Sequence, residues 1–386
     1  MRALLHLETA AWAVLLALFA GFAAYEVSVI ARPFLAGRYL VSDFFAQWTF
    51  AKFALAGHAP QIYDAATLNP FQHALAPALR QTFPYPYPPS FLLYILPLGG
   101  LDFLPAYALW IGLTLALYIA AAWPREGGLL PRALVLLAPA TACNIAFGQN
   151  GFLTAALLLG GFRLLPARPL LAGIAFGLLS YKPQFGVLLP VALVAAGQWR
   201  CILSTAATVA LLVAVSIAAF GWALWPEWLA YLPAHADYLD SAVNSYRKPT
   251  LQAALLLAGA GPAVARAVPL AVLAATIPIT WWAFRTRRPL APALLVAASF
   301  AAAPYAFIYD LPALTAAALA ALAARPDTRA RLLDDAIIAV ALSVPAILTL
   351  TTRFQWTGAA AQLLLFALVT WRARTPAHPA PPAPAQ

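Results

Sequence analysis

The sequence predicts an all-helical, polytopic membrane protein, and three observations support this fold class. First, 63% of the 386 residues are hydrophobic and only 9% are charged, whereas about 25% of the residues in a soluble domain are charged. Second, apolar runs long enough to enter a bilayer recur along the whole chain. Third, most Lys and Arg residues lie in the short loops between these runs, as the positive-inside rule describes.

The basic net charge has a topological explanation rather than a nucleic-acid one. Lys and Arg number 23 against 13 Asp and Glu, which gives a net charge of +10, but cations near the ends of membrane spans serve to orient them. The two cysteines, Cys143 and Cys201, show neither metal-ligand nor disulfide spacing. No Walker loop, dinucleotide fingerprint or nucleophile elbow occurs. We therefore expect no cofactor, no obvious requirement for a divalent metal and no nucleic-acid partner.

The apolar runs set the order of the predicted elements. The first run, about residues 10–30, is too long for a signal-peptide core and is expected to stay in the membrane. Residues 31–84 are expected to form a first outer loop with interfacial helices, and residues 221–250 a second outer loop. The Pro- and Ala-rich tail, 373–386, is expected to be disordered on the cytoplasmic side.

Residues 1–372 are thus predicted to form a single domain with about 10–13 transmembrane helices. Further spans are predicted at 103–122, 133–148, 151–164, 170–181, 184–198, 201–220, 263–284, 290–304, 311–324, 336–351 and 357–371.

Segment 86–98 decides the topology. Its length of about 13 residues suits a re-entrant or interfacial piece better than a full crossing. With a cytoplasmic N-terminus, a re-entrant segment places the larger share of Lys and Arg inside, whereas a full crossing would reverse the sidedness of the following loops as far as the second outer loop. The re-entrant arrangement also places all the polar motifs described next on the non-cytoplasmic side, which favours one outward-facing site.

Asp43 directly follows the first span and opens an aromatic stretch that continues to Gly57. If a helix starts here, Asp43 and Gln47 share one stripe of that helix. The carboxylate could then face a membrane cavity from an interfacial helix. Alternatively, Asp43 is only the N-terminal charge that the helix dipole favours. Spacing leaves both interpretations open.

Three cations are candidates for binding an anion such as a phosphate group. Lys182 lies between two apolar segments, where a buried charge costs about 2.5–3.5 kcal/mol and should snorkel, pair or bind an anion. The adjacent Arg247 and Lys248 lie on the predicted outer side, where the positive-inside rule makes cations unusual. A phosphate contact would explain them, but ordinary solvated loop charges are equally compatible with their spacing.

Polar and aromatic residues at breaks in the apolar runs are the substrate-binding candidates. Gln149 and Asn150 carry amides suited to sugar hydroxyls, although a plain turn is the default explanation of their motif. Asp310 is either a second functional carboxylate or simply a helix start before Pro312. The remaining candidates are Gln47, Tyr87, Gln184 and Tyr246.

Aromatic residues recur every three positions in the second outer loop, at Trp222, Trp225, Trp228 and Tyr231. This pattern is typical of an interfacial aromatic belt. The same residues could instead guide an isoprenoid chain.

Five segments, taken in order, resemble glycosyltransferase family 87. They are residues 43–57, 87–89, 147–150, 179–183 and 304–311, and the resemblance extends over about residues 10–320. Described members of this family are polytopic GT-C enzymes that use polyprenyl-phosphate-mannose in α-1,2-mannosyl transfer. The resemblance implies a GT-C-like helix bundle in which Asp43 is the acidic catalytic residue of the first outer loop. GT-C enzymes often have paired acidic residues there, whereas Phe44 follows Asp43 here, so one carboxylate must suffice.

The sequence therefore predicts an inverting hexosyltransferase in a bacterial inner membrane, with its active site facing the periplasm. The expected partners are membrane lipids, a polyprenyl-phosphate-sugar donor and a cell-envelope lipid or glycan acceptor. Asp43 would act as general base, while Lys182, Arg247 and Lys248 would stabilise the departing phosphate. The alternative is a transporter or flippase of an amphiphilic solute, which commonly shows inverted repeats, and the sequence contains none that we find.

Overall fold

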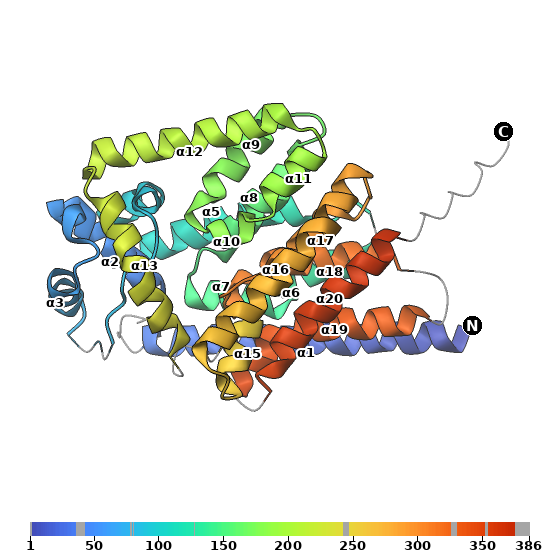
Figure 1. Ribbon diagram of the computed structural model, residues 1–386. Coiled ribbons are helices and arrows are strands. Elements are labelled where there is room, and N and C mark those ends of the chain that lie inside the picture. Colours follow the sequence, from blue (N-terminus) through green and yellow to red (C-terminus); the bar gives the residue numbers. More distant parts are fainter. Residues whose placement is uncertain are drawn as a thin grey trace.

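The computed structural model is a bundle of helices with a smaller helical region at one end (Figure 1). It describes residues 2–35, 43–77, 79, 81–126, 128–241, 247–325, 330–351 and 354–374. Within these ranges every regular element is helical. Among the described residues, six helical segments are long and apolar enough to cross a membrane, and further apolar helices are shorter. The predicted fold class, an all-helical polytopic membrane protein, is confirmed.

The helices follow the predicted apolar runs closely. The candidate spans are Glu8–Val29 within α1 (Arg2–Leu35), α5 (Phe103–Ala122), Leu129–Phe147, α12 (Trp199–Phe220), α16 (Pro262–Arg285) and Arg331–Leu350 within α19 (Ala330–Leu350). The other helices of the bundle are α8 (Gly151–Leu164), α9 (Pro169–Leu178), α10 (Pro183–Gly186), α11 (Leu189–Ala195), α17 (Ala291–Ala302), α18 (Pro312–Ala323) and α20 (Trp356–Arg374). Residues of the predicted tail beyond Arg374 lie outside the described residues.

The third candidate span is bent rather than straight. It consists of α6 (Leu129–Leu137) and α7 (Pro139–Phe147), which meet at Ala138. Ala138 has an extended backbone, with φ −54° and ψ 137°. The cause is Pro139, whose ring excludes the residue before it from the helical region and which then starts α7 without needing a hydrogen-bonded N–H.

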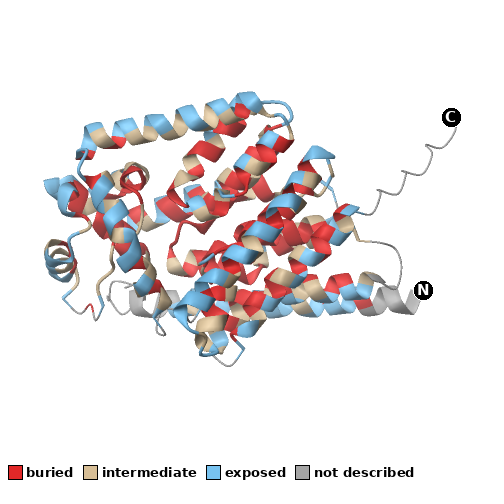
Figure 2. Cartoon of the chain, viewed as in Figure 1, coloured by how far each residue is buried: buried red, intermediate tan, exposed pale blue. Residues whose placement is uncertain are grey.

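Small side chains allow the bundle to pack closely. In α17 every residue except Pro292 is buried, and most of these residues are alanines (Figure 2). A Cβ on Gly173 of α9 would lie 2.5 Å from the Cys201 carbonyl oxygen, and one on Gly177 would lie 2.5 Å from the Thr208 Cβ. These two glycines, four residues apart, therefore let α9 and α12 approach to backbone contact, the usual small-residue solution between membrane helices.

The predicted first outer loop is helical over most of its described residues. It contains α2 (Asp43–Phe53), η1 (Ala54–His58), η2 (Ala59–Gln61) and α3 (Ala65–Leu75). Segment 86–98 is broken into η3 (Pro89–Phe91), α4 (Leu92–Ile95) and η4 (Leu96–Gly100), so it is too short to cross. The predicted helix at Asp43 is present, but protein covers nearly all of α2, where only Asp43 and Lys52 are not fully buried. It therefore does not lie on the bilayer with one face toward lipid.

Most described residues of the predicted second outer loop are helical. α13 (Leu224–Asp240) crosses beside the first outer loop, and α15 (Leu251–Leu257) follows it (Figure 1). Arg266 of α16 holds the end of α13, because its guanidinium lies 2.7 Å from both Asp237 and Asp240. Three members of the aromatic repeat, Trp225, Trp228 and Tyr231, thus belong to α13, whereas Trp222 lies in the turn before it. Trp228 faces the interior of the molecule.

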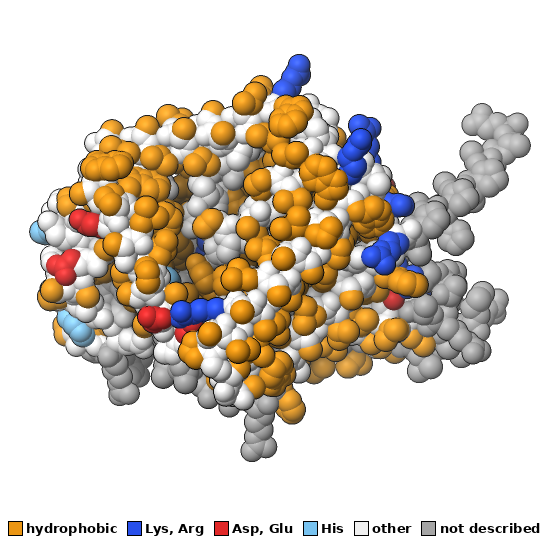
Figure 3. Space-filling model, in the orientation of Figure 1, with side chains coloured by type: hydrophobic (Ala, Val, Ile, Leu, Met, Phe, Trp, Pro, Cys, Tyr) orange, Lys and Arg blue, Asp and Glu red, His pale blue; other side chains and the backbone are white. Residues whose placement is uncertain are grey.

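The bundle has two distinct ends. At one end, α8 and α18 begin, next to α2 and α13; we call this the Asp43 end. At the other, α5, α8 and α18 finish near Arg163; we call this the Arg163 end. On the face that Figure 3 shows, most Lys and Arg side chains gather toward the right, the side on which α20 ends in Figure 1.

Candidate active site

A cavity of about 610 Å³ opens at the Asp43 end. Its walls come from segments far apart in sequence: α2, the loop before η3, the turn between α7 and α8, the residues around Lys182, α13, and the segment that precedes α18. Figure 3 shows the molecule hollowed between α13 and the bundle. Most of the predicted site residues face this one cavity: Asp43, Gln47, Tyr87, Gln149, Lys182, Gln184, Arg247 and Asp310.

Asp43 stands at the first position of α2 and is held by a chain of amides. Gln149 Nε2 donates a hydrogen bond to Asp43 Oδ2 at 3.2 Å, and Gln47 Nε2 donates to Gln149 Oε1 at 3.1 Å. Gly148 makes this arrangement feasible, because it adopts a left-handed φ of 64° at the end of α7 and approaches Phe44 closely. A Cβ there would lie 2.4 Å from the Phe44 Cβ.

The surroundings of Asp43 change its acidity. Burial raises the pKa of its carboxyl to about 6, against the opposing effects of the Gln149 hydrogen bond and the Arg247 charge. The nearby Asp310 charge also raises this pKa, and the Lys182 charge lowers it. A carboxylate with a pKa this close to neutrality is a stronger base than an ordinary aspartate and is still mostly ionised at pH 7.

Lys182 and Asp310 form a buried ion pair. Lys182 Nζ lies 2.5 Å from Asp310 Oδ1, and the two residues are only 5% and 2% exposed. Asp310 Oδ2 accepts a further hydrogen bond from the Phe307 N–H at 3.0 Å. A Lys at this position was expected to snorkel, to pair or to bind an anion, and in the structure Lys182 is paired. Both Asp310 oxygens are occupied. Asp43 also lines the cavity and forms no ion pair with any residue that the structure describes.

The adjacent cations Arg247 and Lys248 separate. Arg247 is exposed, lines the cavity and places its guanidinium 5.4 Å from the Phe147 ring centre. Its left-handed backbone, with φ 66°, turns the chain so that Lys248 points elsewhere. Lys248 is buried and donates to the carbonyl oxygen of Leu239 in the last turn of α13, as cations at helix ends often do. Burial lowers the pKa of Lys248 to about 8.

The remaining substrate-binding candidates also differ in whether they reach the cavity. Asn150 is buried behind the cavity wall, and its Nδ2 donates to the Tyr87 hydroxyl at 2.9 Å, so that it orients Tyr87. Gln184 lines the cavity near Tyr305. Tyr246 lies outside the described residues. In the described part of the chain, no three His, Cys, Asp or Glu side chains come together as a metal-binding group.

The sequence analysis missed part of the cavity wall. His235 and Tyr238 of α13 line it together with Tyr305. The His235 ring stacks between those of Tyr231 and Tyr238, at 5.7 and 6.2 Å between ring centres. Burial lowers the pKa of His235 to about 4, and the Lys248 charge adds to this effect, so the ring is neutral at pH 7. The three- and four-residue spacing of Tyr231, His235 and Tyr238 was the available signal, because it indicates one face of a helix.

This fold and cavity define a polytopic membrane protein with a polar, acid-containing site at one end of its helix bundle. The family model of glycosyltransferase family 87 matches residues 85–308, more than half of the chain. The chain therefore belongs to glycosyltransferase family 87 and is a membrane glycosyltransferase, which acts on a sugar donor and an acceptor. No curated protein and no solved structure matches it. Asp43 and Asp310 both lie outside the matched residues, so their assignment rests on the geometry of the cavity.

Proposed function

We propose that this glycosyltransferase transfers a hexose, mannose by its family resemblance, from a polyprenyl-phosphate donor to a cell-envelope lipid or glycan. The observation that carries the proposal is the joint presence of Asp43 and Arg247 in one cavity. Asp43 has the acidity of a general base, and Arg247 makes no ion pair within the part of the chain that the structure describes. A base and a free cation in one cavity are what sugar transfer from a phosphate leaving group needs.

In the proposed reaction the Asp43 carboxylate removes the proton of the acceptor hydroxyl as its oxygen attacks the anomeric carbon. The bond from that carbon to the phosphate oxygen breaks, and its electron pair leaves with the polyprenyl phosphate. One displacement inverts the anomeric configuration. Gln149 would hold the carboxylate in place, and the Arg247 guanidinium would stabilise the charge that grows on the phosphate.

The walls of the cavity suit an amphiphilic donor. Trp228 and Leu232 of α13 supply apolar surface on one side, and Tyr87 with Gln149 supplies hydrogen-bonding groups on another. A polyprenyl chain could lie against the first wall while the sugar contacts the second. The ion pair of Lys182 and Asp310 would sit beneath the sugar as a fixed dipole rather than as a free phosphate ligand.

The distribution of basic residues supports a periplasmic site in a bacterial inner membrane. The cavity at the Arg163 end is lined by four arginines, Arg125, Arg163, Arg325 and Arg331. The positive-inside rule favours this end for the cytoplasm. The Asp43 end would then face the periplasm.

The test is transfer by the purified full-length protein. It is incubated with a panel of polyprenyl-phosphate sugars and extracted envelope glycolipids, and products are identified by mass spectrometry. We expect a hexosylated product whose formation is lost in Asp43→Asn and kept in Asp64→Asn, an exposed carboxylate of the same loop. Movement of lipid-linked sugar across proteoliposomes without any new glycosidic bond would favour the transporter alternative instead.

A further inference from the structure

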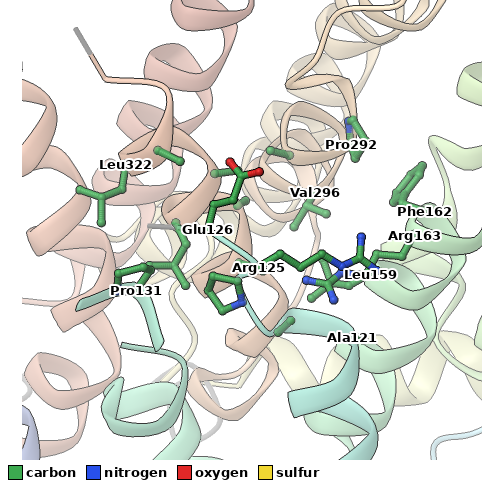
Figure 4. A pocket seen from close by; sticks show the side chains of 18 of the residues that line it. Ala121, Arg125, Glu126, Pro131, Leu159, Phe162, Arg163, Pro292, Val296 and Leu322 are labelled. Atoms are coloured by element: carbon green, nitrogen blue, oxygen red, sulfur yellow. The ribbon is translucent and has the colours of Figure 1, made fainter. Parts of the chain in front are cut away.

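A second cavity, of about 870 Å³, lies at the Arg163 end of the bundle. Because α8 and α18 run from the candidate active site to this cavity, the two are separated by about 20 Å, the length of α8 at about 1.5 Å per residue. Its walls combine arginines with apolar side chains that include Leu159, Phe162, Val296 and Leu322 (Figure 4). The proposed sugar transfer at the Asp43 end involves no residue that lines this second cavity.

Two of its four arginines are neutralised by carboxylates. Arg325 lies 2.9 Å from Glu8 and 2.5 Å from Asp335, and Arg331 lies 2.6 Å from Glu8. These pairs tie α1 to α19 and to the segment between α18 and α19. These ion pairs compensate the positive charge on that side of the cavity, so no bound anion is needed there.

The other two arginines, Arg125 and Arg163, form no ion pair with a carboxylate of the described residues. Arg163 donates to the carbonyl oxygens of Ala120, at 3.1 Å, and Trp123, which end α5. These bonds fix its guanidinium but leave its charge uncompensated. Within the described ranges Arg125 forms no ion pair. Figure 4 shows the Arg125 and Arg163 side chains extending toward one another, while the Glu126 carboxylate points away from both.

Two like charges that converge repel each other unless an anion lies between them. Guanidinium groups match the oxygens of a phosphate in a two-pronged geometry, and basic pockets between membrane helices bind anionic lipid head groups. The apolar side of the cavity, around Leu159 and Phe162, offers surface for an acyl chain. A simple inorganic anion would leave that surface unused.

We propose that Arg125 and Arg163 bind the phosphate of an anionic phospholipid from the leaflet next to the Arg163 end, with an acyl chain of the same lipid against Leu159 and Phe162. The site is separate from the proposed sugar transfer, so its test needs no turnover.

Binding is measured on the full-length protein purified in detergent. The protein is titrated with mixed micelles that contain phosphatidylglycerol, with micelles that contain zwitterionic phosphatidylcholine, and with inorganic phosphate. We expect the phosphatidylglycerol titration to give the lowest apparent Kd, and Arg125→Gln with Arg163→Gln together to raise that Kd about tenfold or more. Arg200→Gln removes an exposed positive charge at the same end outside the cavity and should leave the Kd unchanged.

Loss of the Arg163 bonds to α5 could destabilise the double variant, so Arg125→Gln alone provides the second measurement. It breaks no ion pair and should still raise the Kd several-fold in a protein with an unchanged unfolding temperature. Equal phosphatidylglycerol affinity in wild type and Arg125→Gln would overturn the proposal. Inorganic phosphate that binds as tightly as the lipid would overturn the assignment of a lipid ligand.

Discussion

Replacing Asp43 by asparagine should abolish most catalysis and at the same time stabilise the protein at neutral pH. Asparagine keeps the shape of the side chain but cannot accept a proton from the acceptor hydroxyl. Loss of a general base commonly lowers the rate by about 10²–10⁴-fold. Binding of the donor should persist, because Arg247 and the aromatic wall are untouched.

The stability effect follows from the raised pKa of Asp43. The change from 3.8 to about 6 corresponds to roughly two pKa units, and at 1.36 kcal/mol per unit the ionised carboxylate costs the folded state up to about 3 kcal/mol. Because the folded state binds the proton more tightly than the unfolded one, this cost is fully present above about pH 6 and disappears as pH falls toward 4. Asp43 is only partly buried, so the figure is an upper bound.

Thermal unfolding in detergent and single-turnover transfer, each followed from pH 4 to 8, measure both effects. The wild-type rate should fall tenfold per pH unit below about pH 6, whereas an ordinary aspartate would lose activity only near pH 4. Asp43→Asn should unfold at a higher temperature than wild type at pH 7.5 and at the same temperature near pH 4. If Asp43 only favours the helix dipole, the variant should instead unfold earlier and keep its activity. That result would refute the general-base argument.

Three further predictions follow from the same cavity and fold. Arg247→Ala should raise the KM for a polyprenyl-phosphate donor or lower kcat by about tenfold or more without lowering the unfolding temperature, since its exposed guanidinium forms no ion pair with a described residue. Unchanged donor kinetics would remove Arg247 from the phosphate site. Lys182→Met and Asp310→Asn should each cost about 3–5 kcal/mol of stability, because each leaves one buried partner uncompensated. In thermal unfolding the double variant should recover much of this loss. Additive losses would contradict the pairing. Cysteines introduced at the exposed Gln61 and Arg168 should label from opposite sides of the membrane with an impermeant thiol reagent, because both native cysteines are buried; labelling of both from one side would contradict the proposed topology.

Composition and the apolar runs were sufficient to predict the class of the protein and the positions of most of its helices. Burial in lipid requires long apolar runs without charges, so the spans stand out from composition, and α5 coincides with its predicted range. Residues that interrupt such runs are conspicuous for the same reason. Asp43, Gln149 and Lys182 could therefore be selected as candidates before their positions in space were known.

Tertiary structure decided which of these candidates meet, because that depends on packing between distant segments. Gly148 brings Gln149 to Asp43 across more than a hundred residues of chain. The left-handed turn at Arg247 sends this residue into the cavity and Lys248 to the end of α13. No local pattern distinguishes two adjacent cations whose roles differ only through the direction of one backbone turn.

The wall of the cavity that α13 forms is a second feature that the sequence alone could not predict. Its aromatic spacing suits a helix at the lipid interface as well as one that closes a cavity, and only the fold places His235 inside. The acidity of Asp43 is likewise a tertiary property. The raised pKa of its carboxyl is due to burial and to the Asp310 charge, and it persists although Gln149, Arg247 and Lys182 lower the pKa. Composition and periodicity indicate which segments can be buried in lipid, because charged residues are costly there. The reactivity of a side chain depends instead on which segments of the folded chain surround it.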